Sequence, residues 1–402
     1  MISKRLALYE ELASIRGRPL IVYVTSNRAN ASGNIAGDMV PEFLRQLDAL
    51  PTDVDALDLL VVSNGGDPTV AWRLVTLIRE KVKRFAVLVP QAAYSAATLI
   101  ALGADEIIMH PHGNLGPTDP QISRRRPQKN GSSADAISFS SEDLAAYLKF
   151  IKEDVGLTDQ RQLLEAFNQF SDEVGAVAIA TAARSGQLML NMGQKLLELH
   201  LRTDNERNQA RTISENLTKN YFHHGYPVSR TEASLLGLPV AERSSEIEQI
   251  MWDVWLNICE ELQVRCPFDP VTVLRNKEEC SLLFEPIPQI ALPDGLPQEL
   301  QAAVLQQAIQ NINMDAIPAA EYENIHAVLE SSRLATRYIS RGRVYGSRGL
   351  GGQLNVTSVV ERQGWFDCDL HKQKSGTASK KSAKRVRKKT KKKAVKKVGY
   401  SD

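Results

Sequence analysis

The chain has 402 residues, enough for more than one domain, and 43% of them are hydrophobic, as in an ordinary soluble globular protein. The net charge is +2, but residues 372–402 carry fourteen Lys or Arg and one acidic residue, so the rest of the chain is acidic. No apolar stretch is long enough to cross a membrane, and four cysteines without paired spacing exclude a disulfide scaffold. We therefore expect a cytoplasmic protein with reduced thiols.

Strands and helices alternate through the first part of the chain. Residues 4–15 have the spacing of an amphipathic helix and differ from a signal peptide. Short apolar runs predict strands at 19–25, 56–63, 85–89 and 106–109, with helical patterns between them. This alternation predicts a parallel α/β sheet with right-handed crossovers.

The second part of the chain changes character several times. Residues 141–262 are mostly helical in pattern, whereas prolines interrupt residues 263–330. The β-rich stretch that follows, up to Trp365, predicts a hairpin. The Lys-rich segment 372–402 has too little apolar surface to fold and is expected to be disordered.

Ser95 lies where the third predicted strand turns into a helix, in the sequence Ala-Ala-Tyr-Ser-Ala-Ala. At such a turn a hydroxyl points away from the sheet, beside the free N–H groups of a helix start. This position suits a nucleophile whose transition state carries a negative oxygen. An ordinary N-cap serine fits the same pattern, and the stretch alone does not separate the two.

A second turn, Ser-Asn-Gly-Gly-Asp at 63–67, follows the preceding strand. Two glycines allow backbone geometries that aim N–H groups at a ligand. In a parallel sheet the two turns lie side by side, so Gly65 and Gly66 would face Ser95 and the N–H of Ala96. The combination predicts an oxyanion hole, and a plain Gly-rich turn is the alternative. Residues 27–37 predict a mobile loop over this site.

The histidines do not complete a metal site in the sequence. His110 and His112 lack a third ligand at suitable spacing, so we predict no metal and no cofactor. His223 and His224 lie in a connection between helical segments, where a structural role is the more common one.

Taken together, these motifs resemble the Clp/crotonase-like serine peptidases. Within this group the chain is most similar to the serine dehydrogenase proteinase family, which is related to signal peptide peptidase A. The resemblance covers roughly residues 15–240 and rests on the following segments: Ser63–Asp67, Tyr94–Ala101, Ala104–Met109, Leu115–Ile122, Ser140–Lys152 and His224–Val228 before Gly237.

The resemblance implies a fold and a division of the chain. The fold would be α/β, a Clp/crotonase-like layered β/α superhelix with helical and β-rich C-terminal extensions. The four parts would be a peptidase domain at 1–240, a helical, Pro-interrupted extension at 241–330, a β-rich segment at 331–371, and a disordered tail at 372–402.

The resemblance also implies a nucleophile, Ser95, and an oxyanion hole made by Ala96 with Gly66 or Gly65. The general base is less well marked. Clp proteolytic subunits have a His shortly after the serine, where this chain has Pro-Gln-Ile at 120–122.

Signal peptide peptidase A and its relatives use a Lys near the start of a helix. The matching helix begins near Ser140, and the matching position holds no Lys. Lys129, in the preceding loop, is therefore the predicted base, which would need partial desolvation to lower its pKa. Lys149 and Lys152 lie further along the helix and are expected at its surface.

The resulting hypothesis is a serine endopeptidase that cleaves proteins or peptides as a homo-oligomer without a membrane span. Two alternatives remain: an inactive crotonase-like scaffold or binding protein, favoured by the missing Lys, and an acyl-thioester enzyme, which typically needs an acidic residue instead of Ser95. Residues Lys380–Lys397 would bind nucleic acid or an acidic partner, or would only solubilise the chain.

Overall fold

The computed structural model describes residues 2–125, 136–221, 223–285, 318–348 and 353–370, together with 297, 300–304 and 307. Lys129 and the whole Lys-rich tail, including Lys380–Lys397, lie outside the described residues.

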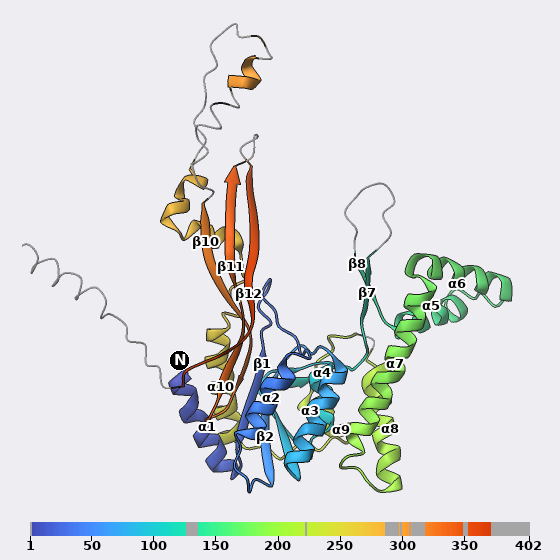
Figure 1. Ribbon diagram of the computed structural model, residues 1–402. Helices are drawn as coiled ribbons and strands as arrows, with labels where there is room; N and C mark the ends of the chain where they lie inside the picture. The colour runs from blue at the N-terminus through green and yellow to red at the C-terminus, as the bar shows by residue number, and fades with distance from the viewer. Residues whose placement is uncertain are drawn as a thin grey trace, which may run out of the picture.

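A seven-stranded mixed sheet forms the centre of the molecule (Figure 1). Its strands follow the order β12-β11-β10-β1-β2-β3-β5, and β1, β2, β3 and β5 are parallel neighbours. The parallel α/β sheet predicted from the sequence is therefore confirmed. The bounds of the parallel strands are Leu20–Thr25 (β1), Ala56–Val62 (β2), Arg84–Val89 (β3) and Glu106–Met109 (β5).

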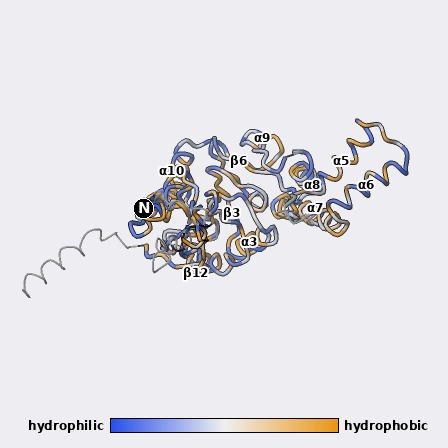
Figure 2. The backbone as a smooth tube through the Cα atoms, turned by 90° about the horizontal axis from the view of Figure 1, so that it is seen from above, coloured by the Kyte–Doolittle hydropathy of each residue, from blue (hydrophilic) through white to orange (hydrophobic). Residues whose placement is uncertain are grey.

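Helices bury both faces of the parallel strands, which explains why these strands are predominantly apolar. In β1, Ile21 and Tyr23 pack among α2, α3 and α4, whereas Val22 and Val24 pack against α1 and α10 on the opposite face. Figure 2 shows α10 and α3 on opposite sides of β3. The helix bounds are Ile2–Arg16 (α1), Met39–Asp48 (α2), Pro68–Lys81 (α3), Ala96–Leu102 (α4) and Ser245–Glu261 (α10).

The C-terminal strands extend this sheet and form a long arm above the body (Figure 1). Strand β10 (Ala319–Glu330) pairs antiparallel with β1, and β11 (Ala335–Arg348) pairs with β12 (Leu354–Asp367) as the predicted hairpin. Residues 319–330, expected in a helical segment, are instead a strand, because the backbone of residues 327–330 pairs with the open edge of β1. The short helices α11 (Pro270–Arg275) and η1 (Glu278–Leu283) pack against the arm.

A buried ion network fixes the arm to the helices behind it. The guanidinium of Arg5 in α1 lies 2.8 Å from a carboxylate oxygen of Glu330 in β10, and Arg337 in β11 reaches the other oxygen at 2.9 Å. All three side chains are buried, so each charge depends on its partners. Helix α1 is thereby joined to β10 and β11.

A helical lobe lies on the other side of the body and projects outward at α5 and α6 (Figure 2). Its core is the antiparallel pair α7 and α8, which packs against α4. The lobe consists of β7 (Ile122–Arg125), β8 (Ala136–Phe139), α5 (Ser141–Glu153), α6 (Gln160–Val174), α7 (Ala176–Leu197) and α8 (Asp204–Lys219).

A small second sheet, of order β4-β6-β9, joins the body to this lobe. Strand β4 (Ala92–Ala93) runs parallel to β6 (Asn114–Leu115), and β9 (Val228–Ser229) pairs antiparallel to β6 before α9 (Arg230–Leu235). The turn that holds Ser95 leaves this sheet directly after β4.

Candidate active site

The backbone of Ser95 is in an unusual conformation for a residue with a side chain. Its φ is 51° and its ψ is −115°, a strained region that non-glycine residues rarely occupy outside functional sites. Its side chain makes no capping hydrogen bond to α4, so the N-cap alternative does not account for it. Ser95 is partly exposed although every residue of the helix after it is buried.

Neighbouring contacts hold this turn in place. The hydroxyl of Thr98 in α4 lies 2.7 Å from the carbonyl oxygen of Ala93 and 2.9 Å from that of Gly116, and its single O–H donates to one of them. The ring of Tyr94 packs so closely on Gly116 that a Cβ there would lie 2.6 Å from it. The strain at Ser95 is therefore supported by both β4 and β6.

The structure brings Gly65, the first of the two glycines at 63–67, against Ser95, whereas Gly66 packs on the backbone of Ile35. A Cβ on Gly65 would lie 2.7 Å from the Cβ of Ser95 and 3.1 Å from the nitrogen of Ala96. Gly65 and Gly66 have φ values of 104° and 149°, which residues with a Cβ rarely adopt. Only glycine therefore fits this close approach.

Gly65 and Gly66 differ in whether their N–H groups have an acceptor. The N–H of Gly65 donates to the hydroxyl of Ser63 at 3.0 Å, and Thr25 in turn donates to that hydroxyl at 2.7 Å. Among the described residues, neither the N–H of Gly66 nor that of Ala96 has an acceptor. The N–H groups of Gly66 and Ala96 are therefore open donors in the glycine turn and the Ser95 turn, whereas the N–H of Gly65 is occupied.

A histidine–aspartate pair, which the sequence analysis did not identify, lies at the same end of the small sheet. Nδ1 of His224 lies 2.8 Å from Oδ1 of Asp119. This hydrogen bond, with the negative charge of Asp119, raises the pKa of His224 above its ordinary value of 6.5 against the opposing effect of burial.

Strand register explains how the pair meets. Ser95 comes two residues after β4, and Asp119 comes four residues after the parallel β6. His224 comes four residues before Val228, the antiparallel partner of Leu115 in β6, so the register carries Asp119 to His224. All three side chains therefore follow the same edge of the sheet, although His224 lies far along the chain.

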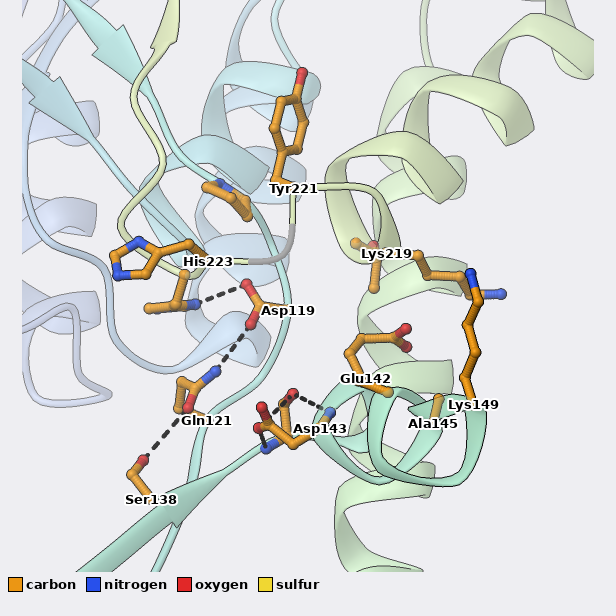
Figure 3. Close-up of a pocket in the computed structure, with 15 residues that line it drawn as sticks. Asp119, Gln121, Ser138, Glu142, Asp143, Ala145, Lys149, Lys219, Tyr221 and His223 are labelled. Atoms are coloured by element: carbon orange, nitrogen blue, oxygen red, sulfur yellow. Dashed lines mark hydrogen bonds and ion pairs between the residues drawn. The ribbon is translucent and has the colours of Figure 1, made fainter. Parts of the chain in front are cut away.

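A pocket of about 480 Å³ opens beside this pair (Figure 3). In the close-up Asp119 lies at the centre, hydrogen-bonded through Gln121 to Ser138 of β8. The other wall is formed by α5 and the end of α8, which contribute Lys149 and Lys219. The pocket therefore lies between the body and the helical lobe.

The lysines predicted near the site differ in what the structure says of them. Lys129 lies in the segment between β7 and β8 that is outside the described residues. Lys149 is 70% exposed and lies 3.8 Å from Glu153, and Lys152 is also exposed, so the expectation that both lie on the helix surface is confirmed.

Neither a metal centre nor a membrane span emerges from the part of the chain that the structure describes. There, no group of three or more His, Cys, Asp or Glu side chains could hold a metal ion. His110 instead stacks on Trp252, with ring centroids 4.6 Å apart. None of the described helices is long and apolar enough to cross a membrane.

Known proteins give the following similarities. Two uncharacterized proteins of Methanocaldococcus jannaschii are 24% and 28% identical to this chain over 60% and 50% of its length, and the matches span 72% and 58% of their own lengths. A solved mutant of the 1510-N membrane-bound stomatin-specific protease overlaps 58% of this chain and 84% of its own, with 17% identity and a TM-score of 0.35.

The family comparison covers the segment built around Ser95. It includes the loop before α2, both glycines, the Ser95 turn and Asp119, and it ends before His224. The sheet and its helices are of the Clp/crotonase-like α/β class. Residues 35–136 match the model of the ClpP-like SDH-type serine proteinases, in agreement with the family that the sequence motifs suggested.

Proposed function

We propose that this chain hydrolyses peptide bonds with Ser95 as the nucleophile and with the N–H groups of Gly66 and Ala96 as the oxyanion hole. The observation that carries the proposal is the strained Ser95 turn pressed against Gly65, with two backbone donors left without an acceptor beside it. A serine held in this way presents its hydroxyl to a carbonyl carbon, while the two N–H groups would donate to the carbonyl oxygen. This arrangement suits an acyl-transfer reaction such as peptide hydrolysis.

His224, oriented by Asp119, is the general base that the described geometry supports best. A neutral imidazole with its Nδ1–H donated to a carboxylate leaves Nε2 to take a proton from a hydroxyl. Its raised pKa keeps it a stronger base than an ordinary histidine. Lys129 remains the alternative base, by resemblance to signal peptide peptidase A.

Variants of the two bases separate these mechanisms. In a Ser–His mechanism His224→Gln should reduce hydrolysis of casein about as severely as Ser95→Ala, since groups that act as a unit are non-additive. Lys129→Ala should then retain activity. His223→Gln is a matched control, because the neighbouring ring of His223 accepts the N–H of Gly225 at 3.1 Å and has no carboxylate partner among the described residues. Loss in Lys129→Ala with full activity in His224→Gln would reverse the assignment.

A fluorophosphonate probe tests the nucleophile itself. Labelling of the wild type and no labelling of Ser95→Ala would support a serine hydrolase. A folded wild type that neither labels nor hydrolyses would favour an inactive scaffold, and activity on acyl-thioesters without labelling would favour the acyl-thioester enzyme.

The remaining proposals concern assembly and partners. We infer protein or peptide substrates and a homo-oligomer, as is common among ClpP-like enzymes, and sedimentation of the full chain tests the second point. We also keep the division at 1–240, 241–330, 331–371 and 372–402 as a proposal, with the qualification that β10 to β12 complete the central sheet. Nucleic-acid binding by Lys380–Lys397 is likewise a proposal.

A further inference from the structure

We propose that His326, in the C-terminal strand β10, is a positioning residue that fixes the oxyanion hole through the loop after β1. This inference rests on the proposed function of Ser95 and Gly66. We call residues 26–35 the strap, because they run from the end of β1 to the glycine turn at 63–67.

The strap begins at a bulge in β10. The register between β10 and β11 shifts between Ile325 and Ala327, so the backbone of His326 is not paired with any residue of β11. Bulges of this kind redirect a residue away from the ladder. The carbonyl of His326 accepts the N–H of Ser26 at 2.7 Å, just beyond the end of β1.

The side chain of His326 holds the strap as well. Its Nδ1 lies 2.9 Å from the carbonyl oxygen of Ser32, which can only accept, so Nδ1 carries the proton. Its Nε2 lies 2.7 Å from the hydroxyl of Ser340 in β11, which donates to it. The ring therefore connects the strap to the second strand of the arm.

Gly33 closes the strap against the same residue. Its N–H donates to the carbonyl of Ser26 at 2.7 Å. A Cβ at Gly33 would lie 2.0 Å from the carbonyl oxygen of His326, so no larger residue fits without moving the strap. The loop expected to be mobile over the site is thus tied to β10 by backbone and side-chain contacts.

The far end of the strap clamps the glycine turn. The N–H of Ile35 donates to the carbonyl of Gly65, and the carbonyl of Ile35 accepts the N–H of Asp67, both at 2.8 Å. A Cβ on Gly66 would lie 2.1 Å from that same carbonyl oxygen. The backbone of Ile35 therefore sets where Gly66 and its open N–H lie, and His326 sets the strap that leads to Ile35.

Two glycines in this loop provide a matched pair of variants. Neither Gly33 nor Gly37 has a left-handed backbone, so alanine is acceptable at both on conformational grounds. A Cβ at Gly37 would meet nothing within 4 Å, whereas one at Gly33 collides with His326. We expect Gly33→Ala to lower kcat on a fluorogenic peptide roughly ten- to a hundredfold with little change in KM, because a misplaced donor weakens transition-state binding. Gly37→Ala should match the wild type.

Two histidine variants test the side chain with the fold held constant. Asn at 326 can donate from the position of Nδ1, whereas Gln places its amide nearer Nε2. His326→Asn should therefore retain most of kcat, and His326→Gln should lose it as Gly33→Ala does. Glu323 lies on the same strand as His326 and forms an exposed ion pair with Arg341 of β11. Glu323→Gln removes this pair and is the control for general damage to the arm.

Affinity for a peptide aldehyde gives a readout that a merely structural role would not change. The aldehyde adds to Ser95 and places its oxyanion in the hole, so its Ki should rise in His326→Gln in proportion to the fall in kcat. Wild-type kcat and Ki in both Gly33→Ala and His326→Gln, in an enzyme that Ser95→Ala inactivates, would overturn the inference and leave the proposed function intact. Equal losses in Gly37→Ala or Glu323→Gln would also overturn it.

Discussion

Replacing Gly66 by alanine perturbs the oxyanion hole by an amount that the structure allows us to estimate. The new Cβ would lie 2.1 Å from the carbonyl oxygen of Ile35 and 2.6 Å from its nitrogen, whereas ordinary contact begins at 3.4 Å. Both neighbours are backbone atoms, so the turn itself must move by more than about 1 Å. A displacement of this size at a catalytic group costs on the order of a hundredfold in rate, or about 3 kcal/mol of transition-state stabilisation.

The substitution also affects folding, because a φ of 149° is strained for any residue with a Cβ. This strain should lower the free energy of unfolding by about 1–3 kcal/mol. Gly156→Ala isolates that effect, since Gly156 has a φ of 78° and an open space within 4 Å. We expect Gly156→Ala to lose stability and keep its activity per folded molecule.

The assay combines urea unfolding with kcat and KM on a fluorogenic peptide, both referred to the folded fraction. Gly66→Ala should lower kcat far more than the loss of folded protein explains, with KM nearly unchanged. A folded Gly66→Ala with wild-type kcat would show that Gly65-Gly66 is only a turn, and the oxyanion hole would have to be sought elsewhere.

Three further outcomes are expected. Ser95→Gly should raise the free energy of unfolding by about 1–2 kcal/mol, because glycine relieves the strain of a positive φ of 51°, whereas Ser95→Ala should not raise it. Both variants should be inactive. Equal thermal stability of the two variants would contradict the strain argument. Activity should appear as the pH rises through the raised pKa of His224, since only the neutral ring accepts a proton. Asp119→Asn should move this acid limb of the kcat/KM profile to lower pH and reduce the plateau of kcat/KM. An acid limb that does not move would exclude His224 as the base. A 1–371 truncation should hydrolyse peptides normally and lose salt-sensitive binding to duplex DNA, whereas equal binding by both proteins would exclude the tail 372–402 as the contact.

Acid limbs also separate the two candidate bases. A histidine base loses its proton near neutrality, whereas a lysine base does so at higher pH unless burial lowers its pKa strongly. The pH profile of Lys129→Ala should therefore match the wild type if His224 is the base.

The parallel strands and the two turns of the candidate site could be predicted from the sequence. Apolar runs such as 56–63 and 85–89 identified the parallel strands, because a strand buried on both faces consists mostly of apolar residues. The turn at Ser95 and the two glycines at 65 and 66 were also found from the sequence, because each feature depends on residues adjacent in the chain. These features sufficed for the family and for the predicted nucleophile.

Contacts between residues far apart in the chain could not be predicted from the sequence. Asp119 and His224 are 105 positions apart, and the register of β4, β6 and β9 brings them to one sheet edge. A histidine in a connecting loop has the same local sequence whether it packs, binds or accepts a proton, so no local pattern identified His224. The same holds for His326, whose contact with the strap requires β10 to pair with β1 across most of the chain. Strand pairing between segments far apart depends on which edge remains open after the local elements have packed, and that is a property of the folded sheet as a whole.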